Sequence, residues 1–408
     1  MDHPQEDRRP PISRLKLALV LGSLSAFGPF ATDMYLSGFP AIATDLHAGL
    51  GEVQFTLSIF FFGMAAGQLV YGPLADRIGR RPPLLVGSAI FAVASLVIAA
   101  SPNVGSMTAL RLFQALGGSA GMIIGRAVVR DCFDLRESAN FIAQLMLIQG
   151  LAPVIAPLVG AWVLVAFGWR TVFLLLGLMG VGAFLAVRFA LPETLPPERR
   201  RVVPVRHLGK IFVGLLRRRG FVVPTAAAAI AFCGLFAYLS GSPHALMQVY
   251  GVSQETYGWL FGLNAVGMIA AAQLNRIFLR LTGPATVFRV TLVAAFAAAI
   301  WLNLAQGTTS LVVFMTPLSL GLALIPLIGA NGIALAMAAS GRDAGSASSI
   351  FGAIQFGLGT AVSAAVGFFH DATARPMTFA ILAATAAATM VIGLDRLIPR
   401  ARSPEDHG

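Results

Sequence analysis

Residues 72–81 read GPLADRIGRR, a stretch rich in glycine, aspartate and arginine between two apolar segments. Gly79 permits the tight turn that a short connection needs, because glycine has no Cβ atom. Asp76 can accept charge-assisted hydrogen bonds from neighbouring cations or N–H groups. A connection that only had to be basic would not need this order of Gly, Asp and Arg. The stretch therefore predicts a structured turn between two apolar helices.

The two apolar segments beside this turn belong to a set of twelve. Each is long enough to cross a bilayer, which takes about 20 residues. The chain has 57% hydrophobic and 12% charged residues and a mean hydropathy of +0.78, so it has more apolar surface than a soluble domain could bury. We therefore predict an all-α integral membrane protein. The predicted spans lie near 15–37, 54–73, 83–101, 104–126, 140–166, 171–191, 221–249, 256–275, 284–305, 309–338, 344–369 and 374–395.

The basic residues test this count, because cytoplasmic loops of membrane proteins are enriched in Lys and Arg. With the N-terminus in the cytoplasm, nearly all of the 29 Lys and Arg residues fall on the cytoplasmic side. Arg170 and Arg375 fall on the other side, and Arg111 lies within a span. The net charge of +11 thus reflects topology, and we expect no nucleic-acid partner. Both termini are predicted to be cytoplasmic.

Residues 192–220 form the one sizeable hydrophilic break in the chain. They divide it into a predicted N-terminal six-helix bundle over 1–191, a cytoplasmic linker over 192–220 and a C-terminal six-helix bundle over 221–408. Two halves of similar length are typical of transporters built from repeats, with a substrate site near the middle of the membrane. A short interfacial helix is predicted at 206–216. The linker arginines either contact lipid headgroups or are a solvated topology signal, which we favour.

Asp33 interrupts the first apolar run, within SAFGPFATDMYLSGFP at residues 25–40. A carboxylate in mid-membrane costs roughly 2.5–3.5 kcal/mol on insertion scales, so it normally faces a cavity or a partner. One interpretation is an aspartate near a helix end that reaches headgroup water. The other is a proton- or cation-binding group in a transport pathway. Arg111 in span four lies at a similar depth, about 10–12 Å from the outer face, so the two side chains can form a pair.

Span five contains QGLAPVIAPLVGA at residues 149–161. Pro153 and Pro157 lie on one helical face and are expected to bend the helix. Ala156 and Gly160 belong to a seam of small residues, which lets helices pack closely. The alternative interpretation is a packing seam with no role in transport.

Several of these stretches resemble the motifs of a known family. GPLADRIGRR matches the loop 2–3 signature of the major facilitator superfamily throughout. RLFQALGG in span four resembles the R-x-x-Q-G motif of twelve-span drug/proton antiporters, with Ala115 at the usual glycine. Span five resembles their g-x-x-x-G-P-x-x-G-G motif, with Ala156 and Ala161 replacing glycines. ATDMYLSGFPAI, PETLPPERRR, FCGLFAYLSGSP and GSASSIFGAIQFGLG are similar to the Bcr/CflA drug-resistance group.

This resemblance implies the major facilitator fold, with two pseudo-symmetric bundles. It also implies a proton-driven multidrug efflux antiporter of the bacterial inner membrane, associated with antibiotic resistance, in which Asp33 and Arg111 couple proton and substrate. Asp76 is expected to face residues 344–348 and Arg130. The expected conformational switch comprises Gly72, Asp76, Arg77, Gly79, Arg80, Arg81 and Arg130. The expected antiporter motif comprises Pro153, Ala156, Pro157 and Gly160.

Polar and apolar side chains within the spans are candidates for an adaptable substrate site. Each of them can equally form an ordinary interhelical hydrogen bond or core contact. The expected partners are a small-molecule substrate, protons and the lipid bilayer, and we expect a monomer. The candidate substrate-binding residues are Phe30, Tyr35, Gln114, Met122, Met146, Gln149, Phe236, Tyr238, Asn264 and Gln355.

Two other functions compete with efflux. A proton-coupled symporter or a metabolite exporter, for instance of an amino-acid-derived substrate, fits the same fold. An intramembrane enzyme is less well supported, because the chain has no H-E-x-x-H motif. It also has no G-x-x-x-x-G-K-[ST] loop, so direct driving by ATP is unsupported. We therefore expect a transporter rather than an enzyme, with no cofactor and no bound metal.

Overall fold

The computed structural model describes residues 12–200, 205–341, 344–369, 371 and 373–397. Twelve helices in these ranges are long and apolar enough to cross a membrane. The predicted all-α class and the count of twelve spans are thus confirmed. The span ends differ from the predicted ones by several residues, because most helices continue past their apolar stretch into polar residues.

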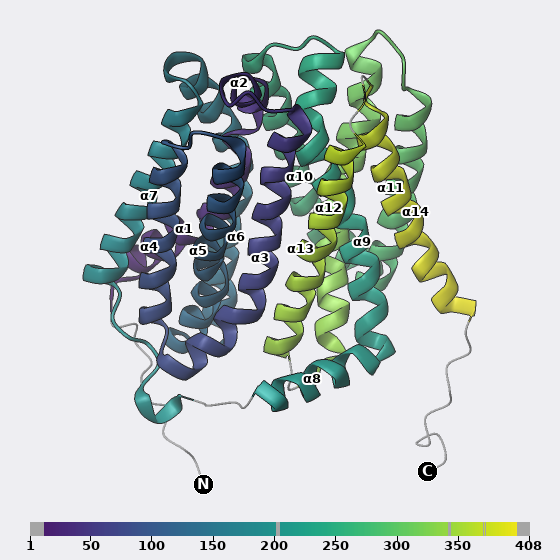
Figure 1. Cartoon of the computed structure of the whole chain (residues 1–408). Coiled ribbons are helices and arrows are strands. Elements are labelled where there is room, and N and C mark those ends of the chain that lie inside the picture. Colours follow the sequence, from purple (N-terminus) through teal and green to yellow (C-terminus); the bar gives the residue numbers. More distant parts are fainter. Residues whose placement is uncertain (1–11, 201–204, 342–343, 370, 372, 398–408) are drawn as a thin grey trace.

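The first half of the chain forms one group of helices, on the left of Figure 1. A short segment, η1 (Leu36–Gly38), and a short helix, α2 (Phe39–Asp45), follow the first long helix and complete its passage. The long helices of this group are α1 (Arg14–Asp33), α3 (Leu50–Ile78), α4 (Arg81–Ile98), α5 (Val104–Cys132), α6 (Leu135–Phe167) and α7 (Trp169–Ala190).

The second half forms the other group, on the right of Figure 1. Along the chain, η2 (Pro197–Arg199) and α8 (Val205–Arg217) come between the two groups. A single wide turn, η3 (His244–Val249), extends the first helix of the second group. α3 packs along α13, and α6 packs along α10, so these pairs join the two groups. The long helices here are α9 (Arg219–Pro243), α10 (Gln254–Thr282), α11 (Pro284–Leu304), α12 (Leu311–Ala338), α13 (Ala344–Phe368) and α14 (Arg375–Leu397).

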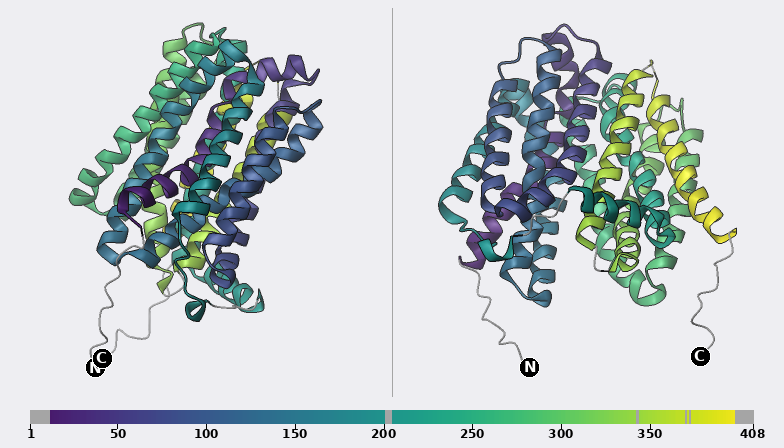
Figure 2. Two further views of the ribbon diagram at one scale, coloured as in Figure 1. Left: turned by 90° about the vertical axis from the view of Figure 1, so that its left-hand side faces the viewer. Right: turned by 60° about the horizontal axis from the view of Figure 1, so that its bottom comes forward.

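α8 lies across one end of the second group, as Figures 1 and 2 show. We call this end of the molecule the α8 side and the opposite end the far side. Leu215 is buried against Phe221, Ala336 and Ile350, which explains why the helix stays at the bundle. The helix predicted at 206–216 is therefore confirmed, with bounds that differ by one residue at each end.

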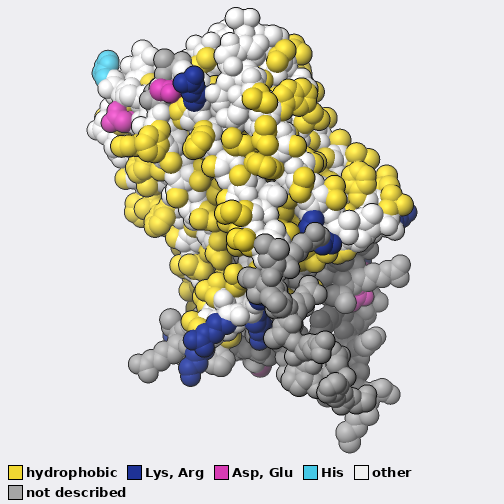
Figure 3. All heavy atoms as spheres, turned by 90° about the vertical axis from the view of Figure 1, so that its right-hand side faces the viewer, with side chains coloured by type: hydrophobic (Ala, Val, Ile, Leu, Met, Phe, Trp, Pro, Cys, Tyr) yellow, Lys and Arg dark blue, Asp and Glu magenta, His cyan; other side chains and the backbone are white. Residues whose placement is uncertain are grey.

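The outer surface carries a broad apolar band. Figure 3 shows hydrophobic side chains over the middle of one face, with Lys and Arg side chains mainly toward the α8 side. Large apolar side chains such as Trp259, Leu304 and Phe379 are more than half exposed. A surface of this kind suits lipid and not water, which agrees with a multi-pass membrane protein.

Glycines in α5 let this helix sit at the centre of the first group. A Cβ at Gly117 would meet the backbone of Phe91 in α4, and one at Gly121 would meet Leu24 in α1. On a third side, α3 presents Gly63 and Gly67 to α5. Such close approach lets helices associate through van der Waals contact within a membrane. α5 is therefore packed against α4, α1 and α3 in three directions.

Candidate functional site

Asp33 is the last residue of α1 and lies where the first passage changes from α1 to η1. Pro29 lacks a backbone N–H group, so the helix loses one hydrogen bond just before this point. The carboxylate of Asp33 is buried, with 4% of the residue exposed, and its Oδ1 accepts a 2.7 Å hydrogen bond from Thr32 Oγ1. A buried carboxylate thus stands at a break in a membrane helix, on the far-side part of the bundle.

Arg111 in α5 is completely buried. Its guanidinium donates hydrogen bonds of 2.9 Å to the Ala31 carbonyl and 2.5 Å to Gln114 Oε1. The same group lies 4.4 Å from the ring centre of Tyr35 and 4.2 Å from that of Phe60. Aromatic faces and neutral oxygens, rather than a carboxylate, therefore stabilise this cation.

Arg111 and Asp33 lie at the same depth, as predicted, because Arg111 binds the carbonyl of Ala31, two residues before Asp33. They do not form an ion pair, however, since none of the ion pairs among the described residues joins them. The rise per residue predicted their depth correctly. Their directions around the two helix axes do not follow from the rise per residue, and the pair that the sequence allows is absent from this conformation.

Two tyrosines of the second group interact electrostatically with Asp33, namely Tyr238 in α9 and Tyr257 in α10. Asn264 Nδ2 donates a 3.0 Å hydrogen bond to the Tyr238 hydroxyl, and Ser319 Oγ donates one of 2.6 Å to Asn264 Oδ1. Two of the substrate candidates, Tyr238 and Asn264, are thus brought together. Sequence reasoning missed Tyr257 and Ser319, because a tyrosine near a span end and a serine within a span are both common.

The two groups of helices meet beside Asp33 on the far side. A Cβ at Gly160 would collide with the Met34 backbone, and one at Gly258 would lie 3.2 Å from the Pro157 carbonyl oxygen. The α6 residues predicted as an antiporter motif, Pro153, Ala156, Pro157 and Gly160, therefore lie in a helix that packs on both η1 and α10.

Contacts between α3 and the second group complete this junction. Ser58 Oγ donates a 2.9 Å hydrogen bond to Ser363 Oγ, and the ring centres of Phe61 and Phe236 are 4.6 Å apart. A Cβ at Gly51 would meet the carbonyl oxygen of Gly367, which indicates equally close contact at the far-side end of the two helices. The two groups are thus closely packed from Asp33 to the far side.

The remaining substrate candidates differ in how far they are buried. Tyr35 and Gln114 are completely buried, and their polar atoms bind Thr56 and Ser95 within the first group, so neither is presented to a substrate here. Phe236 is buried in the junction. The side chain of Met146 lies outside the described residues. The residues that stay partly exposed are Phe30, Met122, Gln149 and Gln355.

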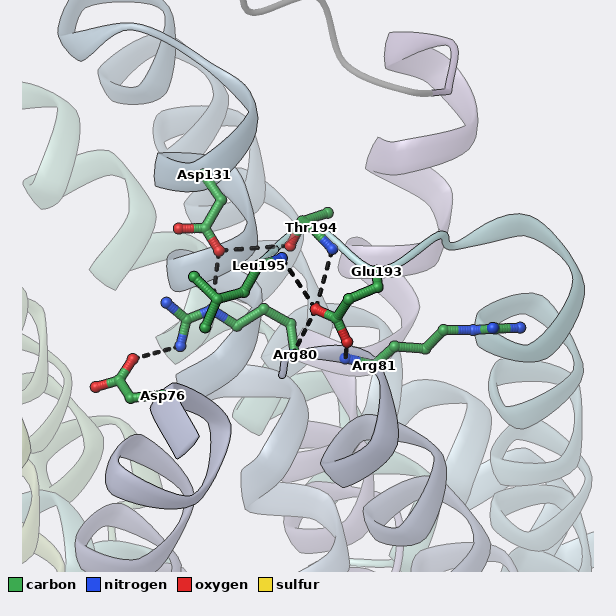
Figure 4. Close-up of polar contacts among 7 residues, drawn as sticks. All are labelled: Asp76, Arg80, Arg81, Asp131, Glu193, Thr194 and Leu195. Atoms are coloured by element: carbon green, nitrogen blue, oxygen red, sulfur yellow. Dashed lines mark hydrogen bonds and ion pairs between the residues drawn. The ribbon is translucent and has the colours of Figure 1, made fainter. Parts of the chain in front are cut away.

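The GPLADRIGRR turn forms a charged cluster on the α8 side, shown in Figure 4. Arg80 donates hydrogen bonds of 2.5 Å to Asp76 Oδ1 and 2.8 Å to Asp131 Oδ2. Burial lowers the pKa of Arg80, but the hydrogen bonds and charges of Asp131 and Asp76 outweigh this effect and raise the pKa overall. Gly79 has a φ of +102°, so the turn adopts a backbone conformation that favours glycine, as predicted.

The partners of Asp76 differ from the expected ones. Its carboxylate binds Arg80 of the same motif, and no hydrogen bond or ion pair among the described residues joins it to Arg130 or to residues 344–348. Instead, Gly72 of the motif lies near α13, since a Cβ there would be 3.6 Å from Ser349 Oγ. Arg80 follows Asp76 by four residues, so its side chain is close enough to bind the Asp76 carboxylate.

Glu193, just after α7, is a member of this cluster that sequence reasoning missed. Its carboxylate accepts backbone hydrogen bonds from Arg80 at 2.8 Å and Arg81 at 3.2 Å, and from Thr194 and Leu195 at 3.0 Å each (Figure 4). Arg81 is the first residue of α4, where an anion is favourable because the N–H groups are unpaired. The stretch PETL that contains Glu193 gave no signal of the contact with Arg80 and Arg81, which lie more than 100 residues away.

A buried carboxylate at a helix break, two closely packed groups of six helices and a charged turn between spans define a membrane transport protein. The chain belongs to the Major Facilitator Superfamily, whose family model matches residues 21–364. The predicted family is thus confirmed.

Known proteins of this kind resemble the chain over most of its length. It is 34% identical to a bicyclomycin resistance protein homolog of Haemophilus influenzae over 88% of this chain and 91% of the relative. It is 30% identical to a chloramphenicol resistance protein of Pseudomonas aeruginosa, over 78% and 77%. The crystal structure of a D-xylose-proton symporter has the same fold, with a TM-score of 0.71 at 12% identity, over 92% of this chain and 97% of that chain.

Replacing Glu193 by alanine is expected to destabilise the turn by roughly 1–2 kcal/mol, because it leaves N–H groups at the start of α4 unpaired. Transport should fall several-fold, whereas Glu193→Gln, which keeps one acceptor oxygen, should retain more activity. Transport in vesicles at matched protein abundance measures both effects. Equal activity of Glu193→Ala and the wild-type protein would contradict a role for this contact.

Proposed function

We propose that this protein is a proton-driven antiporter that exports small-molecule drugs or toxic metabolites across the bacterial inner membrane, working as a monomer. The observation that carries the proposal is the position of Asp33, buried at a helix break where the two groups of helices meet. Intramembrane carboxylates mark proton and ion pathways in transporters. The resemblance to a bicyclomycin resistance protein homolog supports drugs as the substrate class.

Alternating access follows from the same arrangement. Separation of the two groups on the far side would move Gly258 away from α6 and Tyr238 away from Asp33, and it would admit water to the carboxylate. Proton affinity depends on this change in solvation. Proton and substrate would then favour different states of one site, which antiport requires. We propose that protonation of Asp33 releases the substrate and that loss of the proton toward the cytoplasm restores binding.

The charged cluster around Arg80 would act as the conformational switch. It joins the ends of α3, α4 and α5 to the segment that follows α7. α3 also reaches α13 at Gly72 and Ser349. A change in the contact between α3 and α13 would therefore be transmitted to all the helix ends that Arg80 and Glu193 hold together. Arg77 and Arg130 would contribute positive charge that keeps this end in the cytoplasm.

We propose that the α8 side faces the cytoplasm, because most Lys and Arg residues in the described part of the chain lie there. With twelve spans, both termini would then be cytoplasmic as well. A cysteine at Arg217 in α8 should react with an impermeant maleimide only after the membrane is opened, whereas one at Thr309 on the far side should react in intact cells. Both native cysteines, Cys132 and Cys233, are buried and should give little background. The same accessibility for both positions would contradict this orientation.

The test of the function is transport in proteoliposomes with an imposed proton gradient. Uptake of chloramphenicol into acidic-lumen vesicles by protein in the inverted orientation, abolished by a protonophore, is the expected result. Accumulation in the opposite direction would indicate a symporter instead. The absence of any effect of the gradient on transport would contradict proton coupling.

A further inference from the structure

The helix α8 lies across one end of the second group, and its axis crosses the directions of α9 and α13 (Figures 1 and 2). It packs on both of these helices, and its Leu215 is buried against Ala347 and Ile350 near the start of α13. Because the long helices span the membrane, a helix that lies across their ends runs along the membrane surface. The antiport cycle proposed above involves none of the residues of α8.

The apolar residues of α8 occupy two neighbouring sides of the helix. At 100° per residue, Ile211 and Phe212 lie on the same side as Leu215, which is the side packed on the bundle, and all three are buried or half-buried. Leu216 and Val213 follow beside Phe212, on a flank where they are 51% and 50% exposed. Two large apolar side chains on such a flank are more stable against acyl chains than in water.

The third side of α8 is cationic. Lys210 and Arg217 are exposed and seven residues apart, so they point in directions that differ by only about 20°. This side lies nearly opposite Leu215 and adjoins Val213. The helix, VRHLGKIFVGLLR, contains no Asp or Glu, and no ion pair among the described residues includes either cation. Both cations are thus available to an anionic partner.

This arrangement distinguishes two roles for the cations of the linker. A signal that only sets topology needs positive charge, which a loop without secondary structure can supply. α8 instead presents its cations beside an exposed apolar flank, on a helix that Leu215 fixes to the bundle. An apolar flank bordered by cations matches an acyl chain and an anionic headgroup that belong to one molecule.

We propose that α8 is a binding surface for anionic phospholipids in the membrane leaflet on the α8 side. Arg217 and Lys210 would bind the phosphate of the headgroup, since a guanidinium presents paired N–H donors to phosphate oxygens and an ammonium adds a second charge. Val213 and Leu216 would lie against the first carbons of the acyl chains. This inference requires only that the long helices span a membrane, and it is independent of proton coupling.

The experiment measures which lipids contact α8. A fluorophore is attached to Leu216→Cys in the full-length protein, in discs of phosphatidylcholine with a minor fraction of phosphatidylglycerol. Either the phosphatidylglycerol or an equal amount of phosphatidylcholine carries bromine in its acyl chains, which quenches the fluorophore on contact. We expect brominated phosphatidylglycerol to quench more strongly by a factor of roughly two or more, because each cation near the surface favours an anionic lipid. Both native cysteines are buried, so labelling should be largely confined to α8.

Removal of both cations, as Lys210→Gln with Arg217→Gln, should make the two brominated lipids equally effective. The exchange of Lys210→Arg with Arg217→Lys keeps both charges and should keep the preference for phosphatidylglycerol. The matched control is Arg276→Gln with Arg280→Gln, which removes two exposed arginines from the α8-side part of α10. Because these arginines are not on α8, the preference measured at the label should persist.

Equal quenching by the two lipids while both cations are present would overturn the proposal, because the contact would then not depend on headgroup charge. So would a preference that survives the removal of both cations. Quenching by neither lipid would show that this flank of α8 faces water or another protein segment, which would also overturn the proposal. Failure of the proton-gradient assay would leave these results unchanged, so the proposed function and the lipid surface are tested separately.

Discussion

Asp33→Asn is expected to abolish gradient-driven efflux. The substitution keeps the size of the side chain and can still accept the hydrogen bond from Thr32, so the fold should persist. It removes the carboxylate at the break between α1 and η1, and it mimics the protonated state permanently. Transport against a substrate gradient should therefore fall to the level of empty vesicles, while exchange of substrate down its gradient continues.

Binding as a function of pH is the second measurement for this variant. Wild-type binding should change with pH because Asp33 titrates, and Asp33→Asn should remove this dependence. Asp371→Asn, which removes the same charge from an exposed loop, is the matched control and should behave as the wild type does. If Asp33→Asn still concentrates substrate and binds it with an unchanged pH profile, the coupling carboxylate lies elsewhere.

Arg111→Ala should chiefly cause a loss of folded protein. The arginine is completely buried, donates two hydrogen bonds and stacks on two aromatic rings, so its removal leaves a cavity and unpaired acceptors in the first group. The expected destabilisation is roughly 3–5 kcal/mol, from lost cation–π contacts, hydrogen bonds and packing together. Thermal unfolding of the purified variant and its abundance in membranes measure this.

Arg111→Lys helps to separate structure from coupling. It retains the charge and one donor but cannot cover both rings as a planar guanidinium does. We expect a stability between those of the wild type and Arg111→Ala. If Arg111→Ala unfolds at the wild-type temperature but no longer couples transport to the gradient, the role of Arg111 is in proton coupling and not in stability.

The elements that the sequence predicted well are those that depend on local properties. Apolar length predicted twelve spans, a short helix was predicted where α8 lies, and Gly79 predicted a tight turn. Equal depth of Asp33 and Arg111 followed from the constant rise of a helix. Each of these needs only neighbouring residues or a distance along one axis.

The partners of buried charges could not be predicted in the same way. Arg80 binds Asp131, and Glu193 reaches the start of α4, because folding brings together segments far apart in the sequence. The direction of Arg111 depends on rotation about α5, which a depth argument leaves open. The sequence singles out the charged residues within the spans, but the identity of their partners is a property of the tertiary structure.

The hydrogen bonds of Glu193 have a consequence for how the two halves are connected. The backbone N–H groups of Arg80 and Arg81 hold Glu193 at the start of α4, so we propose that the N-terminal six-helix bundle extends past residue 191 to Leu195. The linker between the two six-helix bundles is correspondingly shorter, and it starts at a fixed point beside the charged cluster around Arg80. A gene divided after codon 195 would keep the hydrogen bonds of Glu193 within one fragment. Its two products should therefore reassemble in the membrane more completely than fragments divided after codon 191.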